Sequence, residues 1–404
     1  MAEATYFRKG FGLKGEIEGQ LSADYHSNLI ETLRSRGYRL VVGPLTFRLA
    51  KEFGFCYGVD RAVDYAYETR RKFPERRLHL VGEIIHNPHV NAKLEAMGIT
   101  FLHRTGNGGF DFDHLTADDV VIMPAFGVAI HDFERLKAIG CVLVDTTCGS
   151  VLNVWKRVES YARDGFTALI HGKHWHEETK ATASQVTKYP GGCYLVVLNM
   201  EQARTVCEFI ERGGDATALA TQFAGAMSPG FDFVRDLDRV GLANQTTMLS
   251  TESLAIAEEV RRAMVRKHGE TDAPLHVRTF DTICSATQER QDAVIELLRD
   301  PPELMLVVGG YNSSNTTHLA ALCASRNVRT YHIEDSDCID PVSRELRHRP
   351  IGLKQESVET GWLDGVRSIG ITAGASTPNN KIGETIVRIC SVAGAADLLD
   401  RALV

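Results

Sequence analysis

Residues 45–59 read LTFRLAKEFGFCYGV, and this stretch contains the pattern that decides the fold. The run from Leu45 to Ala50 predicts a strand, and the glycines on either side of Cys56 mark a turn. Beyond the turn, apolar residues recur at helical spacing, at Val59, Ala62, Val63 and Ala66. We therefore expect Cys56 to lie where a strand ends and a helix begins.

The same local pattern surrounds two further cysteines. Before Cys148, residues 141–144 predict a strand, and the helix after it should end near residues 164–165. Before Cys284, residues 276–280 predict a strand. The two following helices are indicated by apolar residues on one face, at Val151, Val154, Trp155 and Val158, and at Val294, Leu297 and Leu298. The chain thus contains three copies of one strand, cysteine and helix unit.

The repeat continues beyond the cysteines. About 30 positions after each of them, a second strand runs into a polar turn, and these turns contain His86, His176 and Ser314. The second strands are expected at residues 78–81, 166–170 and 304–308, and third strand ends at residues 123–127, 244–247 and 372–376. Alternating strands and helices of this kind predict α/β units with mostly parallel sheets.

We predict three tandem α/β units over residues 47–147, 148–283 and 284–379. If these units face one another about a pseudo-threefold axis, their strand-end residues converge on one central site. Residues 1–46 form an N-terminal extension, which we interpret as packing rather than as an interaction arm, and residues 380–404 form a C-terminal helix or tail. The polar stretches near 208–240 and 327–365 lie outside the repeats, and Gly213, Gly214 and Asp215 predict loop in the first of them. Because ligands bind at the carboxyl ends of parallel strands, the strand-end residues are the candidate site.

Composition excludes several classes of protein. The 404 residues are 44% hydrophobic and carry 45 Lys plus Arg against 52 Asp plus Glu, a net charge of -7, so nucleic acid is not an expected partner. No apolar run approaches the ~20 residues that span a bilayer. The first residues contain no apolar core typical of a signal peptide, which predicts a cytoplasmic location.

The nine cysteines are an odd number spread over a long chain without a Cys-x-x-Cys pair, so a disulfide scaffold and a zinc ribbon are not expected. Three thiolates at Cys56, Cys148 and Cys284 suit a soft metal centre. With a fourth protein ligand this would be structural zinc, and without one an iron-sulfur cluster with one open iron. The alternative is three small buried residues at tight turns. The threefold correspondence favours the metal centre, and the other six cysteines lack it.

The polar turns offer uncharged or switchable hydrogen-bond donors beside helix N-termini, which attract anions. Their residues His86, His176, Ser313, Asn315 and Ser376 are candidates for binding a diphosphate or a carboxylate. Glu178 would share a face with His176 if the segment were extended, and a carboxyl in a dry pocket can hold a proton near neutrality. The alternative for Glu178 is an exposed residue that starts a helix.

Taken together, eight segments resemble, in order, the 4-hydroxy-3-methylbut-2-enyl diphosphate reductase family over residues 47–380. They are Gly54-Phe55-Cys56-Tyr57-Gly58-Val59, Ile85-His86-Asn87-Pro88, Asp145-Thr146-Thr147-Cys148, His176-x-Glu178, Gln245-Thr246-Thr247, Cys284-Ser285-Ala286-Thr287, Asn312-Ser313-Ser314-Asn315 and Thr372-Ala373-Gly374-Ala375-Ser376. The resemblance implies a trefoil of three α/β units around a [4Fe-4S] cluster that three cysteines hold and that leaves one iron open.

The resemblance also implies a role for each matching residue. Cys56, Cys148 and Cys284 would hold the cluster, Glu178 would donate the proton and Thr246 would orient the substrate hydroxyl. The diphosphate contacts would be His86, His176, Thr287, Ser313, Ser314, Asn315 and Ser376. The implied reaction is a two-electron reductive dehydroxylation that gives isopentenyl and dimethylallyl diphosphate, the last step of the methylerythritol phosphate route. Reduced ferredoxin or flavodoxin would supply the electrons.

The sequence departs from the commoner family pattern at Ala125-Phe126-Gly127, where many members have a histidine in place of Phe126. This departure, a longer spacing between Glu178 and Thr246, and the N-terminal extension are similar to the longer branch found in oxygenic phototrophs. Two other functions stay open from the residues alone: an iron-sulfur hydro-lyase, which needs no net electrons, and a non-catalytic protein whose cysteines hold a metal for stability.

Overall fold

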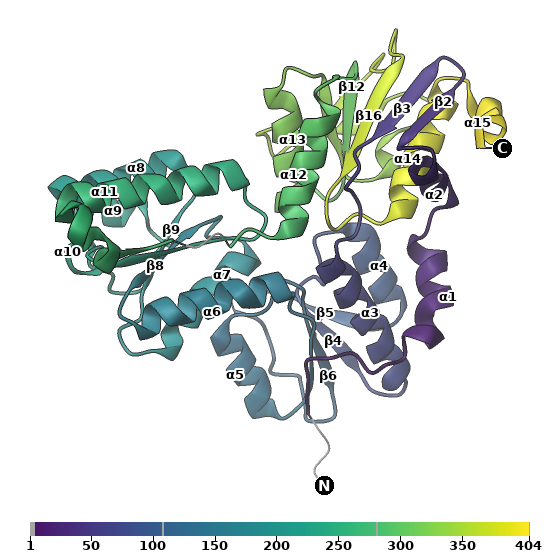
Figure 1. The fold of residues 1–404 in the computed structure, drawn as a ribbon. Coiled ribbons are helices and arrows are strands. Elements are labelled where there is room, and N and C mark those ends of the chain that lie inside the picture. Colours follow the sequence, from purple (N-terminus) through teal and green to yellow (C-terminus); the bar gives the residue numbers. More distant parts are fainter. Residues whose placement is uncertain (1–4, 107–108, 280–281, 404) are drawn as a thin grey trace. The chain divides into compact units, whose positions relative to one another are not determined.

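The computed structural model describes residues 5–106, 109–279 and 282–403 and has an α/β fold (Figure 1). The chain divides into two compact units. The first takes in the chain up to Lys9, Arg76–Gly82 and Thr100–Cys284, and the second takes in Gly10–Glu75, Glu83–Ile99 and Ser285–Val404. Within the described part of the chain, no helix combines the length and the hydropathy needed to span a bilayer.

The first sheet has the strand order β1-β7-β6-β4-β5. The strands are β1 (Tyr6–Phe7), β7 (Val142–Asp145), β6 (Val120–Met123), β4 (Leu78–Val81) and β5 (Ile99–Leu102). The pairs β1 with β7, β7 with β6 and β6 with β4 are all parallel. Helix α5 (Ile130–Ile139) lies between β6 and β7 in the chain, and its Leu136 is buried against this sheet.

The second sheet also belongs to the first unit and is wholly parallel, in the order β11-β10-β8-β9. Its strands are β8 (Thr167–His171), β9 (Tyr194–Val197), β10 (Val240–Asn244) and β11 (Val277–Arg278). Its helices are α6 (Gly149–Arg163), α7 (Glu177–Ser184), η1 (Gln185–Lys188), α8 (Met200–Arg212), α9 (Ala216–Gln222), α10 (Phe233–Asp236) and α11 (Ser250–His276). Helix α11 is broken at Gly269, whose φ of 80° is left-handed.

The second unit contains a third sheet with the strand order β13-β12-β16-β3-β2, in which only β2 is antiparallel to its neighbour. The strands are β2 (Arg39–Val42), β3 (Leu45–Leu49), β12 (Leu304–Val308), β13 (Thr330–Ile333) and β16 (Ser368–Ala373), with a separate hairpin of β14 (Leu346–His348) and β15 (Ser357–Glu359). The helices are α1 (Lys14–Tyr25), α2 (Asn28–Ser35), α3 (Tyr57–Lys72), α4 (Pro88–Ala96), α12 (Ser285–Leu297), α13 (Ser314–Ser325), η2 (Ser336–Cys338), α14 (Asn379–Val392) and α15 (Ala396–Leu403).

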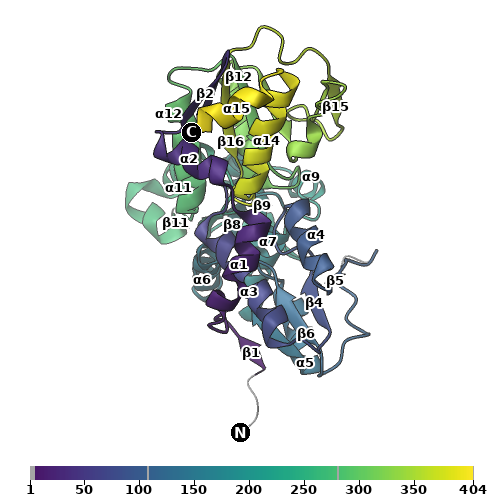
Figure 2. The ribbon, with the colours of Figure 1, turned by 90° about the vertical axis from the view of Figure 1, so that its right-hand side faces the viewer.

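Helices cover both faces of this sheet, which explains why its central strand β12 is continuously apolar and buried. From β12, Leu304 and Leu306 share a core with Ile386 of α14, and Met305 shares a second core with Val294 of α12. Figure 2 shows α14 and α2 on one side of β16. Residues 1–46, predicted as an extension, contribute the edge strands β1 and β2 and the packed helices α1 and α2.

Each of the three predicted cysteines lies directly before a helix, as the sequence predicts. Cys56 and Cys148 are the N-cap residues of α3 and α6, and Cys284 precedes Ser285, where α12 begins. The strand before Cys148 lies in the first sheet and α6 packs on the second. The strand before Cys284 lies in the second sheet and α12 packs on the third. Cys148 and Cys284 therefore each follow the last strand of one sheet in the chain, whereas Cys56 follows β3, and three strands of its sheet come later in the chain.

Some local predictions were incomplete or wrong. Gly213, Gly214 and Asp215 lie in a loop as predicted, but the polar stretch near 208–240 also contains helices α9 and α10. Asp215 and Asp232 cap these helices by accepting backbone N–H groups, which explains how such polar segments become helical. The strand predicted at 276–280 covers only Val277 and Arg278, since His276 still belongs to α11, and Phe280 lies outside the described residues.

A glycine in the middle of β10 gives a first prediction about stability. A Cβ at Gly241 would lie 2.4 Å from the ring of Tyr161, which is fully buried and donates its hydroxyl to the Leu242 carbonyl at 2.8 Å. Because that ring cannot move aside, we expect Gly241→Ala to lower the free energy of unfolding by about 1–3 kcal/mol in urea titrations. Gly19→Ala is the control, since that exposed glycine in α1 has nothing within 4 Å. An equal effect of the two changes would contradict the argument.

Candidate active site

The predicted site residues fall into two groups, one in each compact unit. The first unit contains Cys148, His176, Glu178, Thr246 and Cys284. The second unit contains Cys56, His86, Thr287, Ser313, Ser314, Asn315 and Ser376. Each group is described within its own unit.

In the first unit, Glu178 lies in the first turn of α7. His176 is the N-cap residue, and its Nδ1 accepts the backbone N–H of Glu178 at 3.1 Å. The expectation of an extended segment with both side chains on one face is therefore wrong, because the helix has already begun at Glu177. The alternative of an exposed helix-starting residue is wrong too, since Glu178 is only 3% exposed. A buried carboxyl needs hydrogen-bond partners, because burial disfavours its charged form.

Glu178 is held against the end of β10. Its Oε1 accepts the backbone N–H of Thr246 at 2.5 Å. Next to Thr246, the Gln245 side chain accepts the Thr179 hydroxyl at 3.1 Å and the Lys173 backbone N–H at 3.0 Å. These bonds tie α7 to the end of β10, so the position of the Glu178 carboxyl is determined by two elements rather than by one.

The two predicted metal-binding cysteines of this unit lie near the ends of β6 and β10, respectively. The backbone N–H of Cys148 donates to the Ala125 carbonyl at 2.8 Å, and that of Cys284 donates to the Thr246 carbonyl at 3.4 Å. The hydroxyl of Ser150 lies 3.4 Å from the Cys284 sulfur as a donor. Thr246 thus contacts both the proposed acid, through its N–H, and a proposed metal ligand, through its carbonyl.

The exposure of the cysteines separates them further. Cys56, Cys148 and Cys284 are half-buried, and of the remaining six only Cys193 is. Burial raises the pKa of Cys207 and of Cys323 to about 12 and that of Cys141 to about 11. Thiols with such pKa values stay protonated near neutrality and are poor metal ligands. Burial therefore argues against Cys141, Cys207 and Cys323 as metal ligands.

Phe126, the departure from the commoner family pattern, is buried beside His176. The two ring centroids are 6.2 Å apart with the planes at 72°, an edge-on arrangement. The following Gly127 has a φ of 76°, and a Cβ there would meet the Trp155 ring at 2.4 Å. A phenyl ring cannot donate a hydrogen bond, so at this position the chain offers packing against His176 instead of a contact to an anion.

In the second unit, Cys56 is held between two loops. Its backbone N–H donates to the Ala375 carbonyl at 3.1 Å, and the Ala375 N–H donates to the Asn315 side-chain oxygen at 3.0 Å. The buried Arg290 donates to the Gly54 carbonyl at 2.7 Å. The turn that carries Cys56 is therefore tied to the ends of β12 and β16 and to helix α12.

The predicted anion contacts of this unit are assembled around the start of α13. Ser313 is the N-cap residue and accepts the Thr316 N–H at 3.3 Å. The Ser376 hydroxyl donates to the His86 carbonyl at 3.3 Å. The Nδ1 of His86 lies 2.7 Å from the Glu83 carboxylate. Helix α13 thus begins among the side chains that the sequence singled out.

Two of these side chains present buried polar atoms to this region. Among the described residues, neither the Ser314 hydroxyl nor the Asn315 side-chain nitrogen has a hydrogen-bond partner, and both residues are 2% exposed. Thr287 is equally buried in the first turn of α12. Because buried polar groups are nearly always satisfied, unpaired donors beside a helix N-terminus indicate a place for a ligand, and the helix favours an anionic one.

Sequence reasoning missed several residues that support the site. Arg290 holds the Cys56 turn, Ser150 contacts Cys284, and Arg104 forms an ion pair with Glu177 in which its Nε lies 3.1 Å from both carboxylate oxygens. Ser150 stands two positions after Cys148, so proximity to that cysteine was the available signal for it. For Arg290, a buried arginine on an amphipathic helix was the available signal.

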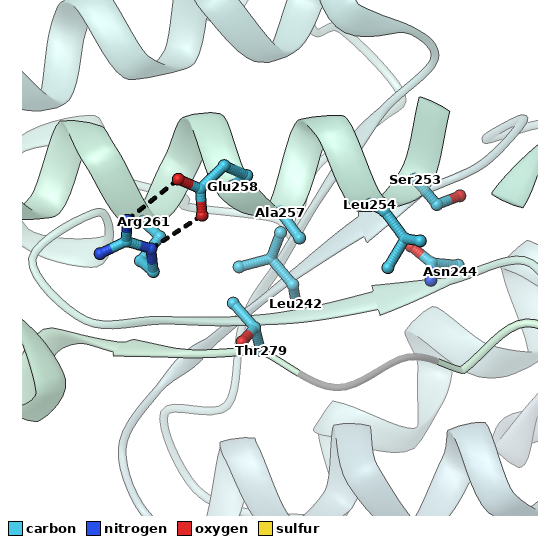
Figure 3. Close-up of a pocket in the computed structure, with 8 residues that line it drawn as sticks. All are labelled: Leu242, Asn244, Ser253, Leu254, Ala257, Glu258, Arg261 and Thr279. Carbon is cyan, nitrogen blue, oxygen red and sulfur yellow. Dashed lines mark hydrogen bonds and ion pairs between the residues drawn. The ribbon is translucent and has the colours of Figure 1, made fainter. Parts of the chain in front are cut away.

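A pocket of about 220 Å³ in the first unit lies apart from the predicted residues (Figure 3). It opens between β10 and α11, and the ion pair of Glu258 with Arg261 lies at one end of it, at 2.8 Å. Its described lining is Leu242, Asn244, Ser253, Leu254, Ala257, Glu258, Arg261 and Thr279, which includes none of the predicted site residues. We therefore assign it no part in the candidate site.

Comparisons with known proteins show which family the chain belongs to. The family model described as LytB protein matches residues 47–390. A 4-hydroxy-3-methylbut-2-enyl diphosphate reductase of Gloeobacter violaceus is 47% identical over 402 residues, 98% of this chain and 95% of that protein. The reductase of the same name from Thermosynechococcus vestitus is 47% identical over 393 residues, 97% of this chain and 96% of that protein.

Solved structures show the same fold. That of the E-1-hydroxy-2-methyl-but-2-enyl-4-diphosphate reductase from Plasmodium falciparum aligns with a TM-score of 0.62 at 22% identity, over 85% of this chain and 87% of that chain. A second, titled (E)-4-hydroxy-3-methyl-but-2-enyl diphosphate reductase, the terminal enzyme of the non-mevalonate pathway, aligns with a TM-score of 0.51 at 26% identity, over 85% of this chain and 98% of that chain. The chain belongs to the LytB family of 4-hydroxy-3-methylbut-2-enyl diphosphate reductases, a family of oxidoreductases.

Proposed function

We propose that this protein reduces 4-hydroxy-3-methylbut-2-enyl diphosphate to isopentenyl and dimethylallyl diphosphate, the last step of the methylerythritol phosphate route. The observation that carries the proposal is the arrangement at Thr246. Its N–H holds the buried carboxyl of Glu178, and its carbonyl accepts the N–H of Cys284. A strand end that fixes both an acid and a thiol is what a proton-coupled reduction at a metal centre requires.

The proposed cofactor is a [4Fe-4S] cluster with Cys56, Cys148 and Cys284 as ligands. The three cysteine thiols fit such a cluster, because they are half-buried while the fully buried Cys207 and Cys323 remain protonated. The free N–H groups at the starts of α3 and α6 favour the negative charge that thiolate ligands carry. When bound, such a cluster supplies one-electron transfer and a Lewis-acidic open iron for the substrate hydroxyl.

Side chains of the protein would donate the proton, orient the substrate hydroxyl and bind the diphosphate. Glu178 holds a proton on its carboxyl and donates it to the allylic substrate, and Thr246 orients the substrate hydroxyl. The diphosphate is bound by His86, His176, Thr287, Ser313, Ser314, Asn315 and Ser376. The burial of Glu178 keeps water away from the proton, and the unpaired donors of Ser314 and Asn315 find their partners in the diphosphate oxygens.

The test is turnover under anaerobic conditions with and without a reductant. Protein purified without oxygen should show the visible absorbance and iron content of an iron-sulfur cluster, and product should form only when reduced ferredoxin or flavodoxin is supplied. Product formation without a donor would instead indicate an iron-sulfur hydro-lyase. A colourless, iron-free protein would indicate a zinc or structural metal site and would refute the proposal.

The unpaired hydroxyl of Ser314 allows a clean test of the diphosphate site. The Ser314 hydroxyl forms no hydrogen bond with a described residue, so Ser314→Ala should leave folding unchanged. The change should weaken substrate binding by about 1–3 kcal/mol. The dissociation constant should be measured by calorimetry with cluster-loaded protein. Ser325→Ala, at the exposed far end of the same helix, is the matched control. If both variants bind the diphosphate as tightly as the parent protein, α13 does not form the anion site.

A further inference from the structure

The loop of residues 309–312 joins β12 to the start of α13, and two side chains of the second unit hold its carbonyl groups. Nη1 of Arg349 donates to the Tyr311 carbonyl at 2.9 Å. The Arg349 guanidinium also lies over the Tyr311 ring, 4.3 Å from its centroid. Nε2 of His332 lies 2.9 Å from the Gly309 carbonyl oxygen. Two of the carbonyl groups in this short loop are therefore fixed by side chains from outside it.

The two side chains that hold the loop are themselves fixed. Arg349 directly follows β14, and its backbone N–H donates to the His332 carbonyl at 2.9 Å, which ties the end of the hairpin to β13. His332 is 3% exposed, and burial lowers its pKa to about 4, so its ring is neutral near pH 7. Because a carbonyl oxygen can only accept, the proton of this ring is on Nε2. The hairpin, which lies outside the three predicted repeats, thus supports the loop before α13.

The held carbonyls determine where the next N–H groups point. In a trans peptide the C=O and the following N–H point in opposite directions, and no cis peptide occurs among the described residues. The Asn312 N–H therefore points away from Arg349, and the Gly310 N–H points away from His332. Neither of these N–H groups donates to a described residue. Because Gly310 is buried, its unpaired N–H indicates a place for a ligand.

The loop also contacts the residues proposed to bind the diphosphate. A Cβ at Gly310 would lie 2.4 Å from the His86 carbonyl oxygen, and the same oxygen accepts the Ser376 hydroxyl. Asn312 stands two positions before Ser314, whose buried hydroxyl has no partner among the described residues. The free backbone donors of the loop thus belong to the same region as the unpaired side-chain donors.

We propose that Arg349 is a positioning residue of the diphosphate site and that the Asn312 N–H is one of the donors of this site, an inference that rests on the proposed function. By holding the Tyr311 carbonyl, the guanidinium fixes the direction of the Asn312 N–H. Its positive charge polarises the same peptide group, which makes the N–H a stronger donor. Backbone N–H groups that follow one another in a turn form anion-binding sites of this kind. Arg349 needs no contact of its own with the anion.

The experiment is a calorimetric titration of full-length, cluster-loaded protein with inorganic pyrophosphate in the absence of oxygen. Arg349→Met retains an apolar stem that can pack on Tyr311 but loses the donor and the charge. We expect pyrophosphate to bind this variant about 10-fold more weakly, since a hydrogen bond to a charged group is worth at least that much. Arg347→Met removes the same charge from the same hairpin, where Arg347 lies 3.4 Å from Glu356, and should bind as the parent does. Equal affinity in the parent and Arg349→Met, or equal losses in the two variants, would overturn the proposal.

Hydrogen exchange and kinetics separate positioning from a general loss of structure. Pyrophosphate should slow amide exchange in residues 310–312 of the parent protein and do so less in Arg349→Met at the same occupancy. With the diphosphate substrate, KM should rise about 10-fold in Arg349→Met while kcat changes little. A fall in kcat without a rise in KM would contradict positioning. A parent protein without turnover would refute the proposed function, but binding and exchange with pyrophosphate would still decide the role of Arg349.

Discussion

Cys148→Ser is expected to yield a folded protein that retains no stable iron-sulfur cluster. With one of three thiolates replaced by a hard hydroxyl oxygen, two soft ligands remain, and such a site loses iron readily. Serine preserves the backbone N–H bond to the Ala125 carbonyl and the start of α6, so folding should not be affected. The measurement is iron and sulfide content, with the visible spectrum, after anaerobic reconstitution.

Cys193→Ser is the matched control for this change. Cys193 is in the same unit and is half-buried like Cys148, but it precedes β9 rather than a helix. Its sulfur contacts the Thr167 hydroxyl at 3.2 Å, a contact that a serine can also make. The iron content of Cys193→Ser should equal that of the parent protein. A full, stable cluster in Cys148→Ser would contradict the assignment of Cys148 as a cluster ligand.

Glu178→Gln is expected to keep the cluster and bind substrate but to lose most turnover. The amide oxygen of glutamine can accept the Thr246 N–H as Oε1 does, so the local structure should persist. The amide has no acidic proton to deliver, and general acid catalysis is commonly worth ~10²- to 10⁴-fold. We therefore expect kcat to fall within that range while KM changes little. Both variant and parent should be assayed with the same chemical reductant, which removes donor docking from the comparison.

The neighbouring Glu177→Gln separates this role from a general effect of replacing a carboxyl by an amide in this turn. Both glutamates lie in the first turn of α7, so the two changes are made at the same end of one helix. Glu177, however, pairs with Arg104 rather than with Thr246. Its loss should affect stability more than turnover, as thermal unfolding and kcat measured on the same samples would show. Similar losses of kcat in the two variants would mean that the proton comes from another group.

The strand, cysteine and helix pattern could be predicted because its signals are local. The apolar runs at 78–81 and 304–308 match β4 and β12, and all their residues are buried, as expected of parallel strands covered on both faces. The helix after Cys148 ends at Arg163, beside the predicted boundary at 164–165. The choice of Glu178 as the acid came from the family resemblance, and burial of its carboxyl was visible only in the structure.

The wrong predictions concern features that depend on tertiary contacts. His176 is an atypical N-cap residue, so the local sequence left both an extended segment and a helix start open at this point. Helix α9 is short and has a polar sequence, and its stability comes from the Asp215 cap and from burial of Leu219. The unpaired Ser314 hydroxyl is a property of packing around α13, which no sequence pattern reveals.

The pairing of β3 with β16 has a consequence for how the protein is made. Thr46 pairs with Ser368, and the Cys56 turn that follows β3 rests on the Ala375 carbonyl, so the first of the three cysteines is positioned by a strand that is synthesised long after it. During translation, the edge of β3 facing β16 stays unpaired until β16 has emerged from the ribosome. Loading of iron and sulfur is therefore expected to follow the synthesis of β16, and a nascent chain arrested before β16 should acquire none.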